Sequence, residues 1–477
     1  MADSQAQLSA KFSQLGPVLI GPTSLFTPRF WNKSNVHVLD ETTRYVPTRD
    51  GTQWGGTATF TQPKRASLTP EYLLEVVIGG STLTNMVPPR TPAAYVNCLG
   101  DQLLTDITHR IGSQILHGYS GEYQQIWQRL TVNEVNEQWR NGLILGGLPL
   151  TQGVATPEFQ RQSALIAGLT LYIPLNRLWF VQHLDEAWMP EAYATQGEIV
   201  VQLNRLERVV YNATARTGGP GGPVPDPFAL GGVRPVIASL ALFAREVTLT
   251  VPEKLARLSY YESDRGLLTL FHDLELQRRV VLPAGTGTGL DREFRVKLDN
   301  IRLDMVELFF VVRRALPTGA LIPANEASVL DDDWAGDALQ APVYNFTVFP
   351  PVRVMSQLAG ATAFIDTMID NLRSFRLEAN GKRLFDNDSD LRNRTWVRRL
   401  YHPDAQPRDP IYTKSFSAAP EDTKNTTSFA NAANLGVLEL VLTIPDYPVN
   451  QGRVVDVMCH SYNIIQSRRG DAVKSLK

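Results

Sequence analysis

The chain has 477 residues, of which 43% are hydrophobic and 20% charged, and this composition excludes a disordered or collagen-like protein. Forty-six Lys and Arg oppose 48 Asp and Glu, and the resulting net charge of -2 disfavours a protein whose main task is to bind nucleic-acid phosphates. At roughly 100–200 residues per domain, the length predicts two to four domains. The basic residues are 10 Lys and 36 Arg, a ratio that favours planar, bidentate pairing at interfaces.

The segment Met1–Phe12 has no apolar run behind a basic start, so no secretory signal peptide is expected. The most apolar windows, Leu165–Val181 and Val233–Val251, are interrupted by proline and charged residues, so neither is expected to span a membrane as a helix. Cys98 and Cys459 are predicted to be buried thiols, because two cysteines form no disulfide framework and both stand beside apolar residues. This cysteine usage is typical of a reducing compartment.

In the first half of the chain, alternation of apolar and polar residues predicts half-buried strands. We expect strands at Tyr72–Ile78 and Leu169–Leu175, and a third in which Ile199, Val201 and Leu203 face inward. A tight turn is expected at Ile111–Gly112–Ser113. A helix is expected over Gly121–Leu130, because Tyr123, Ile126, Trp127 and Leu130 share one face behind a Ser120 cap.

The segment Thr217–Gly232, with six Gly and four Pro, is predicted to be an exposed linker between two halves. The second half continues the alternation, and strands are expected at Val247–Val251, Arg292–Leu298, Ile411–Ser417 and Leu438–Ile444. A short helix is expected from Pro252, and Asn380–Gly381 is a signal for a type I′ hairpin turn.

The two halves share an order of elements. In each, a strand, Tyr72–Ile78 or Arg292–Leu298, is followed by a tight turn, a further strand and a closing strand, and the last two elements begin about 28 residues apart. This order predicts two copies of one β-fold and a mainly β protein.

No motif in the sequence predicts a catalytic, cofactor or metal site. The seven His form no close sequence cluster with Cys or carboxylates, and the glycines of Gly285–Gly289 are not followed by the Lys-Ser/Thr of a phosphate loop. Asp331–Asp333 lacks the remaining ligands of a calcium loop. The basic and aromatic segment Arg394–Arg398 is interpreted as an interface or a packed loop. Paired carboxylates from distant strands, as in a glycosidase, remain open as an alternative.

Six Asn-x-Ser/Thr triplets are candidate glycosylation sites, although chance is the favoured reading without a secretory signal. Their asparagines are Asn32, Asn212, Asn345, Asn387, Asn393 and Asn425.

The segment Tyr95–Leu130 resembles the major capsid proteins of the nucleocytoplasmic large DNA viruses, such as iridoviruses and phycodnaviruses. The matching positions, in chain order, are Gly100, Ile111–Gly112, Gln114–Ile115, Gly121–Glu122 and Ile126–Trp127. Ser113 replaces the second glycine of that family's hairpin.

Further segments resemble the same family in the same order. They are Leu171–Phe180, Met189–Pro190, Ile199–Leu203, Pro252–Leu258, Leu377–Phe385, Ile411–Pro420 and Val454–Gln466. The run Thr427–Asn431 departs from the family pattern.

This resemblance implies two tandem eight-stranded antiparallel jelly rolls with short helices and long loops. We expect residues 1–24 to form an N-terminal arm inside a shell, 25–214 the first jelly roll, 215–232 the linker and 233–477 the second jelly roll. The long loops at 315–343 and 374–409 are expected to form outer towers.

The implied function is that of a structural major capsid protein, not an enzyme. Three chains would form a pseudo-hexameric capsomer, and capsomers would assemble into an icosahedral virion shell in the host cytoplasm. The implied partners are copies of this chain, minor capsid proteins and an internal membrane, without sequence-specific nucleic-acid binding or a cofactor. The alternatives are a minor capsid or penton protein and, more remotely, a β-sandwich carbohydrate-active enzyme or binding module.

Overall fold

The computed structural model describes most of both halves of the chain. The described residues are 37–65, 67–83, 93–96, 99–131, 164–181, 188–212, 228, 232–264, 266–286, 288–299, 301–315, 352–358, 361–367, 372–387, 392–403, 411–422, 427–446 and 452–474. The expected N-terminal arm and the loop at 316–350 lie outside them.

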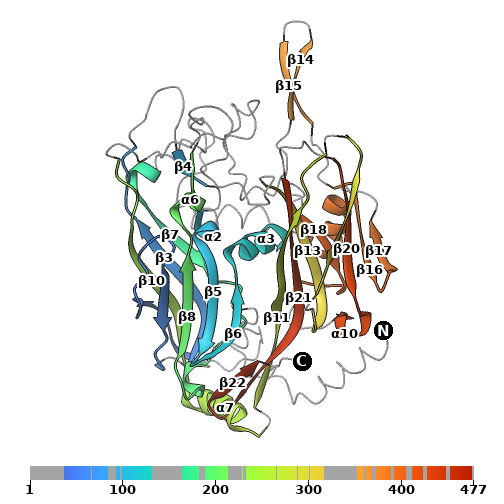
Figure 1. The fold of residues 1–477 in the computed structure, drawn as a ribbon. Helices are drawn as coiled ribbons and strands as arrows, with labels where there is room; N and C mark the ends of the chain where they lie inside the picture. Colours follow the sequence, from blue (N-terminus) through green and yellow to red (C-terminus); the bar gives the residue numbers. More distant parts are fainter. Residues whose placement is uncertain are drawn as a thin grey trace.

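Sixteen strands form four principal antiparallel sheets, two in each half (Figure 1). The first half supplies eight of them: β1 (His37–Tyr45), β2 (Thr57–Thr61), β3 (Leu68–Ile78), β5 (Leu104–Ile111), β6 (Gln114–Tyr119), β7 (Leu169–Pro174), β8 (Gly197–Leu203) and β10 (Ile237–Leu249). Their orders within the two sheets are β1-β10-β3-β7 and β2-β8-β5-β6. We call this unit the first roll.

The second half repeats the arrangement and is called the second roll. Its strands are β11 (Leu267–Leu282), β12 (Arg292–Lys297), β13 (Asp304–Ala315), β16 (Ser374–Ala379), β17 (Lys382–Asn387), β18 (Ile411–Ser415), β20 (Leu438–Ile444) and β21 (Gly452–Arg468). The sheet orders are β11-β21-β13-β18 and β12-β20-β16-β17. Counted within each roll, both follow the order 1-8-3-6 and 2-7-4-5, which is the jelly-roll topology. The expected mainly β fold with two eight-stranded jelly rolls is therefore confirmed.

Shorter elements connect and extend the two rolls. The small strands are β4 (Ala93–Tyr95) with β9 (Val210–Asn212), β14 (Val352–Leu358) with β15 (Ala361–Thr367), β19 (Ala430–Asn431) and β22 (Asp471–Lys474). The helices are α2 (Leu99–Leu103), α3 (Gly121–Thr131), η2 (Pro190–Ala192), α6 (Leu206–Val209), α7 (Val251–Glu262), η5 (Asn393–Val397), α9 (Arg398–Tyr401) and α10 (Ala432–Leu435). The β14–β15 hairpin projects from one end of the molecule and α7 lies at the other (Figure 1).

The alternation in the sequence gives the inward faces that it predicts. Ile199, Val201 and Leu203 of β8 are buried, as are the predicted inward residues of β20, Leu438, Leu440, Leu442 and Ile444. The predicted hairpin turn has Asn380 at φ 49 and Gly381 at φ 74, the left-handed conformations that a type I′ turn requires. Cys459 is buried as predicted, and Cys98 lies outside the described residues.

The predicted start of the second roll at residue 233 is wrong. Strand β10 pairs with β1 and β3 and therefore completes the first roll. A jelly roll needs its eighth strand between its first and third, and period-two alternation does not reveal which sheet a strand joins. The second roll begins after α7 instead. Val251 is also exposed at the start of α7 and does not continue the strand.

Three further expectations need correction. Residues Ser374–Asn387 form β16 and β17, so this part of the expected tower loop belongs to a sheet. Phe228 is buried in the core of the first roll, so this part of the Gly/Pro-rich segment is not an exposed connector. The strand Arg292–Leu298 corresponds to β2 by topology, and the counterpart of Tyr72–Ile78 is β13.

Candidate functional site: the interface between the two rolls

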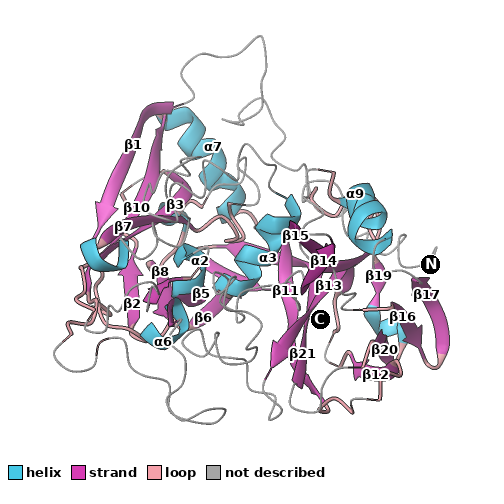
Figure 2. Ribbon diagram, turned by 90° about the horizontal axis from the view of Figure 1, so that it is seen from above, coloured by secondary structure: helices cyan, strands magenta, loops and turns pink. Residues whose placement is uncertain are grey.

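The sheet β11-β21-β13-β18 is buried on both of its faces. Strand β21 is buried without alternation over its first twelve residues. On one face, Val455, Val457 and Cys459 belong to the core of the second roll. On the other face, Val454 and Met458 belong to the core that is continuous with the first roll. One hydrophobic core thus crosses from roll to roll, and Figure 2 shows the two rolls side by side with α3 between them.

The start of α3 is fixed by its local sequence. The Ser120 hydroxyl accepts a hydrogen bond from the Tyr123 amide at 3.1 Å, which caps the helix as predicted. Gly121 has no space for a side chain, because a Cβ there would lie 2.1 Å from the Asp101 carbonyl oxygen and 2.4 Å from that of Leu104. The side-chain amide of Gln124 also donates to the Asp101 carboxylate at 2.9 Å, so α3 is held against α2.

Two aromatic residues of α3 contact the second roll. Tyr123 hydrogen-bonds with His460 of β21 and stacks on Phe309 of β13 at a centroid distance of 6.1 Å. The Trp127 ring lies 4.5 Å from the His460 ring. Burial lowers the pKa of His460 well below its ordinary value, so its imidazole is neutral at pH 7. Large aromatic surfaces placed this way contribute much of the packing energy of an interface.

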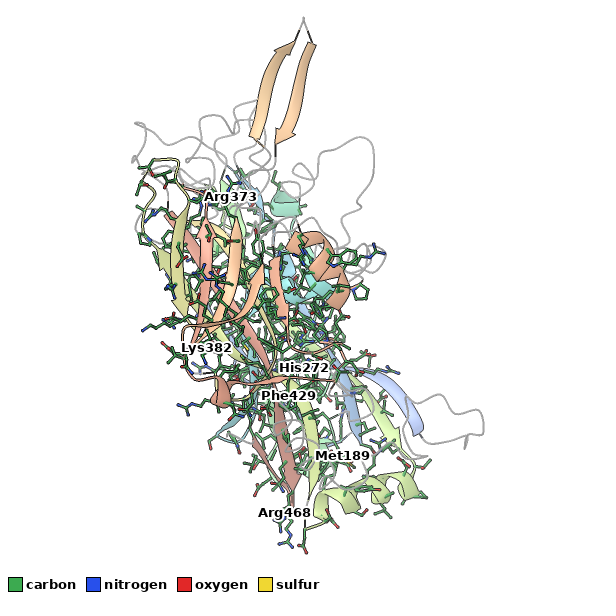
Figure 3. All side chains as sticks on the ribbon, turned by 90° about the vertical axis from the view of Figure 1, so that its right-hand side faces the viewer. Met189, His272, Arg373, Lys382, Phe429 and Arg468 are labelled. Carbon is green, nitrogen blue, oxygen red and sulfur yellow. The ribbon has the colours of Figure 1, made fainter. Side chains whose placement is uncertain are left out.

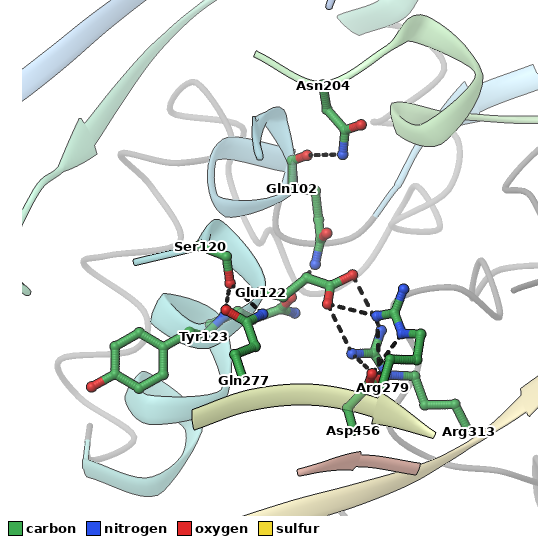
Figure 4. A network of polar contacts seen from close by, with 10 residues as sticks. Gln102, Ser120, Glu122, Tyr123, Asn204, Gln277, Arg279, Arg313 and Asp456 are labelled. Atoms are coloured by element: carbon green, nitrogen blue, oxygen red, sulfur yellow. Dashed lines mark hydrogen bonds and ion pairs between the residues drawn. The ribbon is translucent and has the colours of Figure 1, made fainter. Parts of the chain in front are cut away.

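A charged network lies beside these rings and joins α3 to three strands of the second roll (Figure 4). Arg313 of β13 is 0% exposed and contacts Asp456 at 2.8 Å and Glu122 at 3.1 Å. Arg279 of β11 contacts the same two carboxylates at 2.6 Å and 3.0 Å. Burial would raise the pKa of Glu122, but the charges of Arg313 and Arg279 outweigh it and lower that pKa. Two cations and two anions therefore balance, as burial requires.

His402 joins a second polar cluster to the same region. Its imidazole contacts Glu307 of β13 at 2.8 Å and Glu421 at 2.6 Å, and it meets the Trp127 ring edge-to-face. Burial alone would lower the pKa of His402, but the charge of Glu307 and the hydrogen bonds with both carboxylates raise it to about 9. His402 is therefore a cation at pH 7, whereas His460 is neutral.

A separate set of contacts joins the rolls toward the α7 end. Tyr193 hydrogen-bonds with Ser467 at 2.7 Å, and the Ala194 amide donates to the Gly470 carbonyl at 2.7 Å. Lys474 of β22 contacts Asp273 at 2.6 Å, and Asp273 lies 4.0 Å from His117 of β6. Met189 of the first roll and Arg468 of the second lie toward this end in Figure 3. The rolls are thus joined along much of their length.

The structure brings together histidines that the sequence does not show as neighbours. His109 and His117 face each other across the β5–β6 hairpin, and burial lowers the pKa of each to about 3. Neither forms a metal site, because no group of three His, Cys, Asp or Glu that would hold a metal occurs among the described residues. No described helix is long and apolar enough to cross a membrane.

Three of the six candidate glycosylation asparagines lie among the described residues. Asn393 is 0% exposed and its amide exchanges two hydrogen bonds with the Thr413 backbone, so the folded chain has no room for a glycan there. Asn212 ends β9 and Asn387 ends β17. Asn32, Asn345 and Asn425 lie outside the described residues.

Sequence reasoning missed most of the residues that join the rolls, including Arg313, Asp456 and His460. The available signal is the run Val454–His460, in which Asp456 and His460 interrupt an apolar strand. Polar groups on one face of a strand ordinarily indicate solvent, but here that face meets a second layer that supplies their partners.

The fold is a double jelly roll, in which one chain forms two eight-stranded jelly rolls. The first roll packs on the outward face of the β11-β21-β13-β18 sheet of the second. No family model matches the sequence, and no curated protein is significantly similar to it.

The fold has clear counterparts among solved structures. The chain is similar to one in the quasi-atomic model of the PBCV-1 virus capsid, with a TM-score of 0.63 and 12% identity over 95% of this chain and 99% of that one. It is similar to the Faustovirus major capsid protein, with a TM-score of 0.61 and 12% identity over 96% and 94%. It is also similar to a chain in the structure of the Sputnik virophage, with a TM-score of 0.55 and 10% identity over 95% of this chain and 91% of that one.

Proposed function

We propose that this chain is a structural major capsid protein, and not an enzyme, that trimerises into pseudo-hexameric capsomers of an icosahedral shell. The observation that carries the proposal is the double-buried sheet β11-β21-β13-β18, which fixes two jelly rolls side by side as one unit. A chain with two similar rolls gives a trimer six similar units, and such a ring tiles a surface with nearly sixfold contacts. The fold shared with the PBCV-1 and Faustovirus capsid proteins supports this reading.

The mass of the purified protein tests the proposal. Multi-angle light scattering should give about three times 53.0 kDa, and electron microscopy of the same sample should give threefold particles with a pseudo-sixfold outline. A protein that stays monomeric at all concentrations and hydrolyses or retains glycans would instead support the carbohydrate-active alternative. A minor capsid or penton protein would assemble only at vertices or between capsomers in reconstructed particles.

The finer features belong to the same proposal. We propose an N-terminal arm at 1–24, a first roll that extends through β10, and a second roll that follows α7. Minor capsid proteins and an internal membrane are proposed partners, and the host cytoplasm is the proposed site of assembly. Cross-linking of purified virions followed by mass spectrometry tests these partners, because contacts with lysines of this chain identify each neighbour directly.

A further inference from the structure

The two rolls carry equivalent helices at equivalent places. In the first roll, α3 follows the fifth strand, β6, and in the second roll η5 and α9 follow the fifth strand, β17. Within the chain, α3 covers the outward face of the sheet with order 1-8-3-6 in the neighbouring roll. The equivalent contact for η5–α9 would be the outward face of β1-β10-β3-β7. That sheet lies on the side of the first roll turned away from the second roll (Figure 2).

The η5–α9 helix has the surface of an interface element. Trp396 is 62% exposed and Leu400, one turn further along, is 58% exposed. Arg399 beside them is exposed as well. The opposite side of the helix is fixed to the chain, because Arg398 is buried and donates to the Arg129 carbonyl of α3 at 2.5 Å. An exposed Trp beside an exposed Arg on a helix that is held in place is typical of a binding hot spot.

The outward face of β1-β10-β3-β7 has complementary chemistry. Phe243 of β10 pairs with Leu73 of β3, and its ring lies 6.4 Å from that of Tyr172 on β7. All three side chains are partly exposed. Glu75 of β3, on the same sheet, contacts Arg44 of β1 at 3.1 Å. The outward face of β1-β10-β3-β7 therefore carries an apolar patch with a carboxylate. On the corresponding sheet of the second roll, β11-β21-β13-β18, the outward face is covered by α3.

We propose that η5–α9 of one copy packs on the outward face of β1-β10-β3-β7 of a second copy. Trp396 and Leu400 cover Leu73, Tyr172 and Phe243, and Arg399 meets Glu75. The contact is heterologous, because two different surfaces meet, and a heterologous contact repeated about a threefold axis closes into a ring of three copies. This interface rests on the proposed capsid function and names the surfaces that build the trimer.

Two exposed-residue variants test the two sides of the contact. Trp396→Glu should raise the concentration of half-dissociation of the trimer at least about 30-fold, and Phe243→Asp should do the same from the other side. Circular dichroism should show each variant folded. Leu400→Glu should weaken the trimer as Trp396→Glu does. Leu290→Glu is its matched control, because Leu290 is 71% exposed outside both surfaces and its variant should remain trimeric.

A mixture of the two variants adds a test that only a heterologous contact passes. Trp396→Glu retains an intact sheet face and Phe243→Asp an intact helix, so titrating one labelled variant into the other should form a dimer of about twice 53.0 kDa. Trimeric variants, a mixture without dimer, or an equal loss in Leu290→Glu would overturn the interface. These results differ from failure of the proposed function, in which the unmodified protein itself would be monomeric.

Discussion

Arg313 is a fully buried cation whose position depends on two carboxylates from different rolls, Glu122 and Asp456. Breaking a buried pair leaves an uncompensated charge, and this costs more than the pair contributes over an apolar replacement. The network therefore fixes the register of the rolls more than it adds stability. In this arrangement of α3 on β13, each of the four charged groups has a partner of opposite charge.

We expect Arg313→Met to lower the free energy of unfolding by about 3 kcal/mol, because Asp456 and Glu122 keep only Arg279. Urea denaturation checks the value. The matched control is Arg278→Met on β11, whose exposed guanidinium lies 3.5 Å from Asp299 and whose loss should change stability by less than about 0.5 kcal/mol. Equal effects of the two substitutions would contradict a buried network.

His402 is expected to lower the stability of the folded chain as the pH rises above neutral. Its pKa is about 9 in the folded chain and about 6.5 when unfolded, so between these values the folded state binds one more proton. Its contribution is complete below pH 6.5 and is lost as the pH rises through 9. We expect His402→Gln to be less stable at pH 6.5 and to lose less stability between pH 7 and 9.5. Parallel pH profiles of variant and unmodified protein would contradict this.

His109 and His117 act in the acidic direction. Because both have a pKa of about 3 in the folded chain, the unfolded chain binds their protons first as the pH falls below 6.5. Their contribution is present above pH 6.5 and is lost as the pH falls toward 3. We expect His109→Phe to flatten the decline of urea midpoints between pH 6.5 and 4. A decline as steep as that of the unmodified protein would exclude His109 as its source.

At the scale of elements, α3 depends on one glycine for steric reasons. We expect Gly121→Ala to lower the free energy of unfolding by about 2–3 kcal/mol, because its Cβ would overlap the Asp101 and Leu104 carbonyls. Gly381→Ala is the comparison, since that site has φ 74 but open space and should lose only about 1 kcal/mol. Chemical denaturation measures both, and the reverse order of the two losses would contradict the steric argument.

The elements differ in how far their sequence predicts them. The helix at 121–131, its Ser120 cap and the Asn380–Gly381 turn are local features, and local residues predict them well. Strand β21 is different, because its two buried faces remove the alternation on which a strand prediction depends. The place of β10 is decided by partners almost 200 residues earlier in the chain, and no local pattern carries that information.

At the scale of the whole molecule, the resemblance to capsid proteins predicted two jelly rolls, whereas the interface between them could not be predicted. Glu122, Tyr123 and Trp127 stand in the segment Tyr95–Leu130 that gave the resemblance, and His460 stands in Val454–Gln466, but no resembling segment contains Phe309 or Arg313. Contacts between distant surfaces depend on the relative placement of two folded units. Composition and periodicity report only the structure of each unit.

Strand β10 pairs with two strands from much earlier in the chain, so we can predict how the protein behaves when the chain is cut between them. A specific protease site inserted between residues 220 and 221 would leave β10 on the C-terminal fragment and its neighbours β1 and β3 on the N-terminal one. We expect the two fragments to remain together in size-exclusion chromatography and to separate only in denaturant. Two contacts would hold the fragments together: the pairing of β10 inside the first roll, and the packing of α3 on the second roll. Fragments that separate in native buffer would contradict both contacts.

A substitution in β10 separates the first contact from the second. Leu242 is fully buried in the core of the first roll, so Leu242→Asp should weaken the association of the two fragments if β10 belongs to that roll.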